Sequence, residues 1–177
     1  MDYTPALKFV ELKLQHMEKL LQSFYTIRFP DCDPFGHLNN SRYIDYMLNA
    51  REDHLRDYYN LNLDSYYKQG LGWMVNSHQI HFARPALYNE KVCIQSCLID
   101  AGESHLLVEM TMWDESLKTC KAILWTRFVS VNLKTGRKEK HSAEFSEFAN
   151  SVLLEGIALD GGPEKRITAL TAAMSKA

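Results

Sequence analysis

Residues 31–43 of the chain read DCDPFGHLNNSRY. A proline, a glycine and two asparagines within ten residues predict a loop, and Asn39 or Ser41 can cap a helix that follows it. We expect that helix over about residues 42–59. Apolar side chains are spread around most of its circumference, which indicates a buried helix, whereas the polar stretch 51–54 in its second half is predicted to emerge into solvent.

The sequence on either side of this helix predicts strands. Residues 23–29 read as a short strand, which an amphipathic helix over residues 4–22 precedes. Downstream, apolar residues alternate with period two, which is typical of half-buried antiparallel strands, and the connections are short. The four downstream strands are expected at residues 73–83, 91–101, 104–114 and 120–132.

The order of these elements indicates an α+β fold. A strand, a helix and four strands do not alternate, which disfavours a parallel doubly wound sheet. The helix spans about 27 Å and the long strands about 33–40 Å, so one sheet is long enough to wrap one buried helix. After a turn at residues 134–137, a second amphipathic helix is expected near residues 145–153, and Gly161–Pro163 breaks the chain before an Ala-rich tail.

Composition sets limits on partners and location. The 177 residues are 46% hydrophobic and 24% charged, which is ordinary for a globular domain. A formal charge of −2 provides no global field for nucleic acid or an anionic membrane, and no apolar run approaches the ~20 residues of a bilayer span. The four cysteines form no C-x-x-C motif, and the N-terminus does not resemble a secretory signal. We therefore expect a cytoplasmic protein with no nucleic-acid or membrane partner.

The loop before the helix carries side chains suited to acyl transfer. It places Asp33, His37 and Asn39 next to a helix N-terminus, whose free N–H groups and dipole can hold a developing oxyanion. A carboxylate there can activate water or attack an acyl carbon directly. The alternative is structural, in which Asp31 or Asp33 only shapes a turn and Asn39 only caps the helix.

The string D-x-D-P-F-G-H-x-N-N-x-x-Y, from Asp31 to Tyr43, resembles the hotdog-fold acyl thioesterases of the 4-hydroxybenzoyl-CoA thioesterase group and their acyl-ACP thioesterase relatives. HFARPALY at residues 81–88 and NLKTGR at residues 132–137 are similar to the second strand and terminal turn of that family. The resemblance implies a hotdog domain at residues 23–140, an antiparallel β-sheet wrapped around a long central helix. The segments on either side, residues 1–22 and 141–177, are expected to be helical extensions.

The same resemblance implies catalytic roles for the loop. Asp33 matches the carboxylate that acts as general base or nucleophile on the thioester. His37 matches the histidine of the acyl-ACP-type motif, and Asn39 matches an asparagine that we expect to position rather than react. The sequence departs from the family pattern at Phe35, where plant-type acyl-ACP enzymes carry a catalytic Asn, and at Asn40, where another bacterial branch carries a His.

Substrate-binding residues are expected beside the loop and in a basic turn. Gly36 lets the backbone approach the substrate closely, and Tyr43 belongs to an aromatic lining that is mostly core but can wall an acyl pocket. Arg84, Lys134 and Arg137 are candidates for holding CoA phosphates or the acidic face of an acyl carrier protein. The resemblance implies an acyl-CoA or acyl-ACP substrate and a homodimer or tetramer with sites between subunits. No metal or organic cofactor is expected, since CoA or phosphopantetheine is part of the substrate.

Two rivals to a thioester hydrolase of fatty acid metabolism stay open. Hotdog domains also include dehydratases and hydratases of acyl thioesters, which use a histidine with an acidic partner on the central helix. His54 or Glu52 would then matter more than Asp33. A non-catalytic acyl-CoA-binding module is the other rival, and Asp33 argues against it because a binder needs no carboxylate aimed at the carbonyl.

Overall fold

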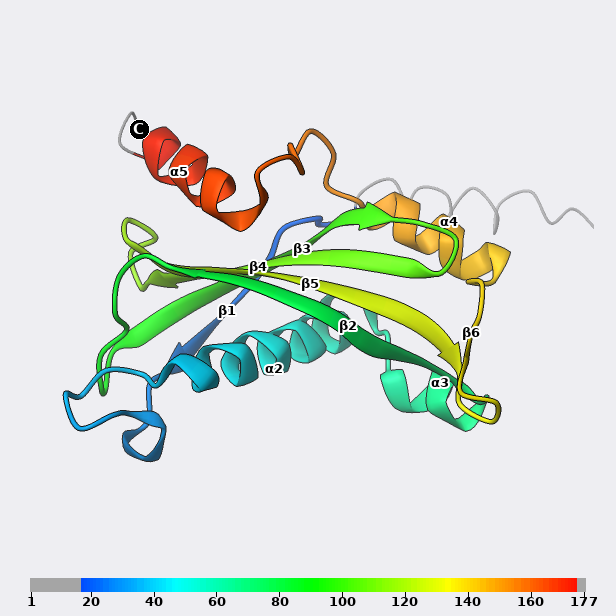
Figure 1. The fold of residues 1–177 in the computed structure, drawn as a ribbon, viewed down its shortest axis with the longest axis horizontal. Coiled ribbons are helices and arrows are strands. Elements are labelled where there is room, and N and C mark those ends of the chain that lie inside the picture. Colours follow the sequence, from blue (N-terminus) through cyan, green and yellow to red (C-terminus); the bar gives the residue numbers. More distant parts are fainter. Residues whose placement is uncertain (1–16, 175–177) are drawn as a thin grey trace, which may run out of the picture.

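A single antiparallel sheet forms the centre of the protein in this computed structural model, which describes residues 17–174 (Figure 1). The strands are β1 (Leu21–Thr26), β2 (Leu71–Phe82), β3 (Lys91–Ala101), β4 (His105–Asp114), β5 (Cys120–Asn132) and β6 (Arg137–Lys138). Their order is β1-β3-β4-β5-β2, with β6 paired to the end of β5. All pairings of neighbouring strands are antiparallel, as the alternating sequence pattern predicts.

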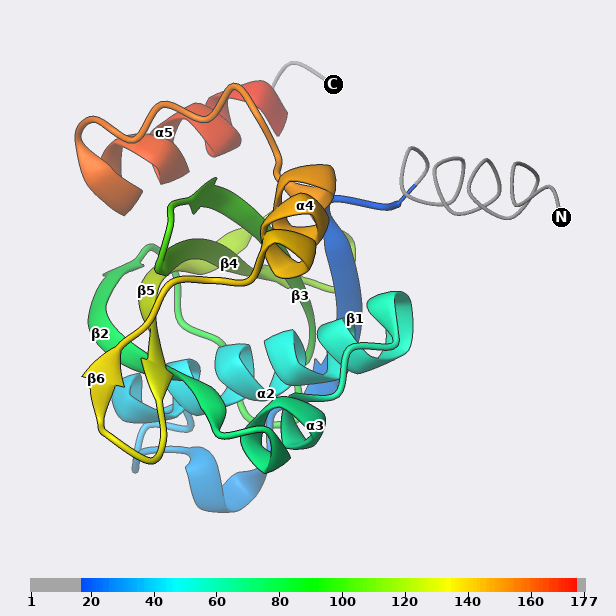
Figure 2. The same ribbon diagram turned by 90° about the vertical axis from the view of Figure 1, so that its right-hand side faces the viewer.

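The long helix α2 (Asn40–Tyr59) lies in the concave face of this sheet, as Figures 1 and 2 show. Its residues Tyr43, Met47 and Ala50 are buried in one apolar cluster with strand residues such as Val108 and Met110. Steps of four and three residues return to the same face of a helix, so these side chains form one stripe toward the sheet. The prediction of one sheet wrapped around one helix is confirmed.

The second half of α2 differs from its prediction. The helix buries one stripe rather than most of its circumference, and that stripe includes Arg51 and His54 as well as Tyr43, Met47 and Ala50. Arg51 and His54 do not emerge, because they continue the apolar stripe in steps of four and three. Position on the helix, and not side-chain polarity, decides their burial.

The outer face of the sheet is covered by a further helix, α5 (Gly162–Met174), on the opposite side from α2 (Figure 2). Ile167 of α5 packs in a second apolar cluster with Trp113, Ile123 and Trp125. The central strands therefore bury both faces, whereas the sequence pattern predicted half-buried strands. The prediction was wrong because the segment that reads as a short Ala-rich tail forms a helix that packs on this face.

Two shorter helices close the end of the sheet where α2 finishes, the end that Figure 2 faces. They are α3 (Leu63–Lys68), which the sequence analysis did not predict, and α4 (Ala143–Val152), which is the predicted second amphipathic helix. The ring of Phe145 in α4 lies 4.9 Å from that of Trp73 in β2 and 6.0 Å from that of Tyr66 in α3, measured between centroids. These aromatic contacts join both helices to the sheet.

The N-terminal segment differs partly from its prediction. Most of the expected helix over residues 4–22 lies outside the described residues, but residues 17–20 are not helical and Leu21 already begins β1. β1 ends at Thr26, and the 3-10 turn η1 (Phe29–Asp31) leads into the loop. The other predicted strands agree with the structure within two residues at each end. The arrangement is the expected α+β hotdog fold.

Candidate functional site

The predicted catalytic loop, residues 31–40, is held against the segment that follows β2. The N–H of Leu38 donates to the carbonyl of Ala86 at 2.8 Å, and the N–H of Tyr88 donates to the carbonyl of Gly36 at 2.8 Å. His37 forms a β-bridge with Leu87 between the same two segments. Two motifs that lie far apart in the sequence therefore meet at the start of α2.

The two carboxylate oxygens of Asp33 have different surroundings. Oδ1 accepts hydrogen bonds from the N–H groups of Phe35 at 2.9 Å and His37 at 3.0 Å, whereas none of the residues 17–174 donates to Oδ2. The N–H of Asp33 donates to the carbonyl of His37 at 2.8 Å, which closes the turn. The half-buried carboxylate is thus fixed through one oxygen and open at the other. A carboxylate held in this way can act as a base or a nucleophile.

Gly36 and His37 form the tip of the loop. Gly36 has φ +75° and nothing within 4 Å of the position of a Cβ atom, so the left-handed backbone and not crowding requires glycine. The half-buried His37 ring lies 6.4 Å from the ring of exposed Phe35. Within the described part of the chain, no group hydrogen-bonds to its ring nitrogens. Both nitrogens are therefore available to a ligand.

Asn39 is the N-cap of α2. Its Oδ1 accepts from the N–H of Ser41 at 3.1 Å and from the Ser41 hydroxyl at 2.9 Å. The N–H groups of residues 35–39, 41 and 42 all have acceptors within the protein. The expected oxyanion donors are therefore fewer than the sequence suggested. The N–H of Asn40, the first residue of α2, is left without an acceptor among the described residues.

Asp31 and Cys32 precede Asp33 in the loop, but their surroundings suit them less well to react with a substrate. Asp31 Oδ2 accepts from the hydroxyl of Tyr46 at 2.8 Å, and its Oδ1 lies 3.6 Å from Nε of Arg42. Burial, with the nearby carboxylates of Asp31 and Asp33, raises the pKa of the Cys32 thiol. A thiol with a raised pKa remains protonated at neutral pH and is a poor nucleophile.

The predicted substrate-binding residues fall into two groups. Tyr43 and Arg84 lie beside the loop, where the buried Tyr43 hydroxyl accepts from the N–H of Ala86 at 2.9 Å and Arg84 is exposed. Lys134, in the turn between β5 and β6, and Arg137, the first residue of β6, are exposed next to the start of β2. The 12 residues of β2 span about 40 Å. Within one chain, the basic turn is therefore remote from Asp33.

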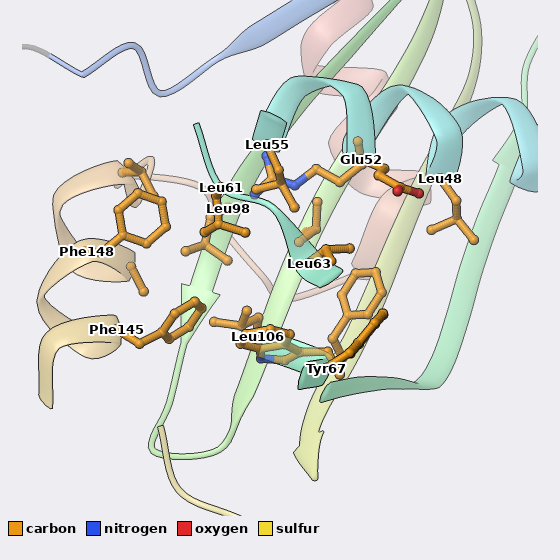
Figure 3. A pocket seen from close by; sticks show the side chains of 16 residues that line it. Leu48, Glu52, Leu55, Leu61, Leu63, Tyr67, Leu98, Leu106, Phe145 and Phe148 are labelled. Carbon is orange, nitrogen blue, oxygen red and sulfur yellow. The ribbon is translucent and has the colours of Figure 1, made fainter. Parts of the chain in front are cut away.

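An apolar cavity of about 220 Å³ lies beside the C-terminal half of α2 (Figure 3). Its walls include Leu48 and Leu55 of α2, Leu63 of α3, Leu106 of β4 and Phe148 of α4. None of the three predicted catalytic residues lines it. The sequence does not reveal this cavity, because its wall is assembled from elements that are distant along the chain.

A buried polar chain begins at the cavity wall. Arg51 lines the cavity, and its Nη1 donates to Oγ of Ser96 at 3.3 Å. Oγ of Ser96 lies 2.8 Å from Nδ1 of His54, and Nε2 of His54 lies 2.7 Å from Oγ of Ser23. Burial, with the nearby Arg51 charge, lowers the pKa of His54 to about 4, so the imidazole is neutral at pH 7. The only signal in the sequence for this row of buried polar side chains is the helical spacing of Arg51 and His54.

A family model matches most of the chain, and solved structures share its fold. The model of the thioesterase-like superfamily matches residues 27–153. The fold is similar to that of YbaW, a probable thioesterase from Escherichia coli, at 22% identity and a TM-score of 0.66, over 76% of this chain and 99% of that chain. No curated protein matches the chain.

Two further solved structures have the same fold. The 1,4-dihydroxy-2-naphthoyl-CoA thioesterase Slr0204 from Synechocystis has 14% identity and a TM-score of 0.67, over 74% of this chain and 96% of that chain. The 12:0-ACP thioesterase from Umbellularia californica has 14% identity and a TM-score of 0.69, over 80% of this chain and 53% of that chain.

None of the helices in residues 17–174 is both long enough and apolar enough to cross a bilayer.

The family match covers most of the sheet, all of α2 and all of α4. Both the sheet topology and this match therefore lead to the same assignment. The chain belongs to the thioesterase-like superfamily.

Proposed function

We propose that the protein hydrolyses acyl thioesters of CoA or of an acyl carrier protein, and that Asp33 is the catalytic carboxylate. The observation that carries this proposal is that the two carboxylate oxygens of Asp33 have different surroundings. Oδ1 is held by two backbone N–H groups, and Oδ2 is open beside the start of α2. A fixed, half-buried carboxylate with one free oxygen is suited to reaction with an acyl carbon or a water molecule.

The reaction follows from these positions by one of two routes. As a general base, Asp33 takes a proton from water while the water oxygen bonds to the thioester carbonyl carbon, and collapse of the tetrahedral oxyanion breaks the C–S bond. The thiolate leaves and takes up a proton, which gives a carboxylic acid and a thiol. As a nucleophile, Asp33 bonds to the carbonyl carbon itself, expels the thiolate and forms an anhydride that water then cleaves.

Two neighbouring groups support this chemistry. The N–H of Asn40 at the first position of α2 is the backbone donor left to polarise the carbonyl and hold the oxyanion, where the positive end of the helix dipole adds to its effect. The ring nitrogens of His37 are available to orient water or substrate. Asn39 keeps the role of a cap, since Ser41 occupies its Oδ1.

The active unit we propose is a dimer joined through β2. This strand is at the edge of the sheet, is 12 residues long and exposes Met74, Val75 and Phe82. A long apolar edge of this kind is normally covered by another strand. Antiparallel pairing of two β2 strands would bring the turn with Lys134 and Arg137 of one copy beside Arg84 of the other, where cations can hold the phosphates of CoA or phosphopantetheine.

The dehydratase alternative receives no support from the geometry of His54. Both ring nitrogens lie within hydrogen-bond distance of serine hydroxyls, the side chain is 1% exposed, and it does not line the cavity. A histidine in this position has no free nitrogen for a substrate proton. Glu52 does line the cavity, but it lacks the histidine partner that the alternative requires.

A thiol-release assay on the purified protein tests the proposal. Acyl-CoAs and acyl-ACPs with short, medium, long and aromatic acyl groups are compared, and the products are separated to detect hydration of an enoyl thioester. Release of thiol together with free acid is expected for at least one substrate class. Hydrated thioester without thiol release would identify a hydratase, and tight binding without either product would identify a binding module; both outcomes would contradict the proposal.

A further inference from the structure

The cavity beside the C-terminal half of α2 has a wall that is apolar except at two ionisable positions on neighbouring residues of that helix. Leucine and aromatic side chains from α2, α3, α4 and the concave face of the sheet form most of its surface. Figure 3 shows Leu55, Leu61, Leu98 and Phe148 around one side and Leu48, Leu63 and Tyr67 around the other. The charged exceptions are Arg51 and Glu52.

Arg51 is a buried cation with few partners. Its exposed fraction is 8%, and within residues 17–174 it forms one hydrogen bond, to Ser96, although a guanidinium carries five N–H donors. Among the described residues no carboxylate lies within ion-pair distance of it. Burial lowers the pKa of Arg51, but a guanidinium remains charged at neutral pH. A buried charge without a counter-ion is unfavourable, so the binding of an anion beside Arg51 would stabilise it.

The surrounding polar groups do not supply that anion. The chain from Arg51 through Ser96 to His54 and Ser23 is complete with a neutral imidazole, so it contributes no negative charge. Tyr59 and Cys97 lie close enough to affect Arg51, but burial raises the pKa of each to about 12, so both are neutral. Glu52 is exposed, and Figure 3 shows its carboxylate beside Leu48 rather than beside Leu55.

We propose that this cavity binds an amphiphilic monocarboxylate, with its carboxylate on the Arg51 guanidinium and its hydrocarbon body among the leucine and phenylalanine side chains. The carboxylate accepts the N–H groups that Ser96 leaves free, which a planar guanidinium presents in matching geometry. The hydrocarbon body replaces the solvent that the apolar wall otherwise contacts. Glu52 at the exposed rim disfavours a second negative charge there.

The volume fixes the size class of the ligand. A dry apolar cavity of about 150 Å³ holds benzene, so by proportion a cavity of about 220 Å³ holds about nine non-hydrogen atoms. A medium-chain fatty acid such as octanoate is of this size. The ligand is a free acid rather than the acyl end of a bound thioester, because an ordinary acyl chain ends in a neutral methyl group that cannot pair with the Arg51 guanidinium.

Isothermal titration calorimetry with three eight-carbon ligands tests the charge requirement on the wild-type protein. Octanoate is expected to bind at least about tenfold more tightly than 1-octanol, which has the same chain without charge, and octylamine is expected to bind more weakly than either. Equal affinities for octanoate and octanol would overturn the proposal, since they would reduce the cavity to a general apolar site.

Variants of the two ionisable wall residues provide matched controls with opposite signs. Arg51→Met keeps an unbranched apolar side chain and is expected to bring octanoate affinity within about twofold of that for octanol, while thermal stability rises because a buried unpaired charge is removed. Glu52→Gln is expected to leave octanoate binding unchanged or tighter. Arg51→Lys retains a charge and is expected to bind octanoate with intermediate affinity. Wild-type octanoate affinity in Arg51→Met would contradict the proposed contact.

The test of octanoate binding does not depend on whether the protein hydrolyses thioesters. Octanoate binding is measured without turnover, and Asp33→Asn is expected to bind octanoate as the wild type does, whether or not it hydrolyses thioesters. Octanedioyl-CoA and octanoyl-CoA form the last comparison, which distinguishes a free acid from a thioester with a distal carboxylate. Similar affinities for the two thioesters are expected. Tighter binding of octanedioyl-CoA that Arg51→Met abolishes would contradict the free-acid assignment.

Discussion

At the scale of single residues, Asp33 has a structural role in the loop and an oxygen left over for the catalytic role that we propose. Its Oδ1 shapes the turn by accepting from the N–H groups of Phe35 and His37, and its Oδ2 is left open. The structural and the catalytic interpretation therefore do not exclude one another, because each uses a different oxygen. Asn39 differs from it, since the helix cap occupies the Oδ1 of its side chain.

His54 gives the fold a pH dependence with a definite sign. The folded protein holds the imidazole neutral with a pKa of about 4, whereas an unfolded chain takes up the proton near pH 6.5. Below pH 6.5 the unfolded state therefore binds more protons, and the free energy of unfolding decreases until the folded pKa is reached. We expect a loss of about 2.4 kcal/mol between pH 7 and pH 4.5.

Urea unfolding of the wild type and of His54→Gln over this pH range measures that contribution. Glutamine can hydrogen-bond to both serines but does not titrate, so the variant is expected to show a smaller decrease. His78 and His141 also have pKa values lowered by burial and leave a residual slope in both proteins. Identical slopes would show that His54 does not carry the effect.

At the scale of elements, a feature could be predicted when residues close to it in the sequence determine it, and not when distant residues do. The bounds of β3 and β5 follow from alternation and flanking turn residues, and the structure agrees with them at both ends. A helical extension was predicted for residues 141–177, but the packing of α5 on the sheet could not be, because Gly161–Pro163 reads as a break and the burial of Ile167 depends on contacts with distant strand residues. The loop residues of the candidate site are predicted by a local motif, whereas the cavity wall is not.

Beside the apolar packing of Ile167, an ion pair between Arg166 and the buried Glu109 joins α5 to the sheet. Arg166 donates to both oxygens of Glu109 at 3.0–3.2 Å, and the indole N–H of Trp125 donates to the same carboxylate at 2.9 Å. Glu109 is almost fully buried on the outer face of the sheet. Loss of Arg166 would therefore leave a buried carboxylate without its cation.

A double-mutant cycle measures this attachment. Arg166→Ala is expected to lower the free energy of unfolding by about 3 kcal/mol, and adding Glu109→Gln is expected to recover most of that loss because the buried charge is gone. Urea unfolding of the two single variants and the double variant gives the coupling. Additive losses in the double variant would mean that the pair does not hold α5.

At the scale of the whole molecule, the two edges of the sheet are unequal. β2, at one edge, has 12 residues and exposes Met74, Val75 and Phe82, whereas β1, at the other edge, has six residues and exposes Phe24. The longer edge, β2, is the one that we propose for a second copy. Pairing at this edge would also bring the basic turn of one copy to the loop of the other. The distance between Lys134 and Asp33 within one chain therefore argues for a dimer as the active unit.

Light scattering after size exclusion tests the dimer. The wild type is expected to have about twice the chain mass of 20.5 kDa. Val75→Lys places like charges on the two edges that meet and is expected to give a monomer with lower kcat/KM, while the uncharged control Val75→Thr remains dimeric. A dimeric Val75→Lys protein with full activity would exclude β2 as the contact.

The central claim is that Asp33 supplies the reacting carboxylate, and the most direct measurement is kcat/KM of Asp33→Asn on the best thioester. Asparagine keeps the Oδ1 acceptor for the N–H groups of Phe35 and His37, so the turn and the melting temperature should be preserved. Asp31→Asn, at a carboxylate already bound by Tyr46, is the control and should retain activity. We predict a decrease of at least about 100-fold for Asp33→Asn. A folded Asp33→Asn protein with kcat/KM near that of the wild type would contradict the account.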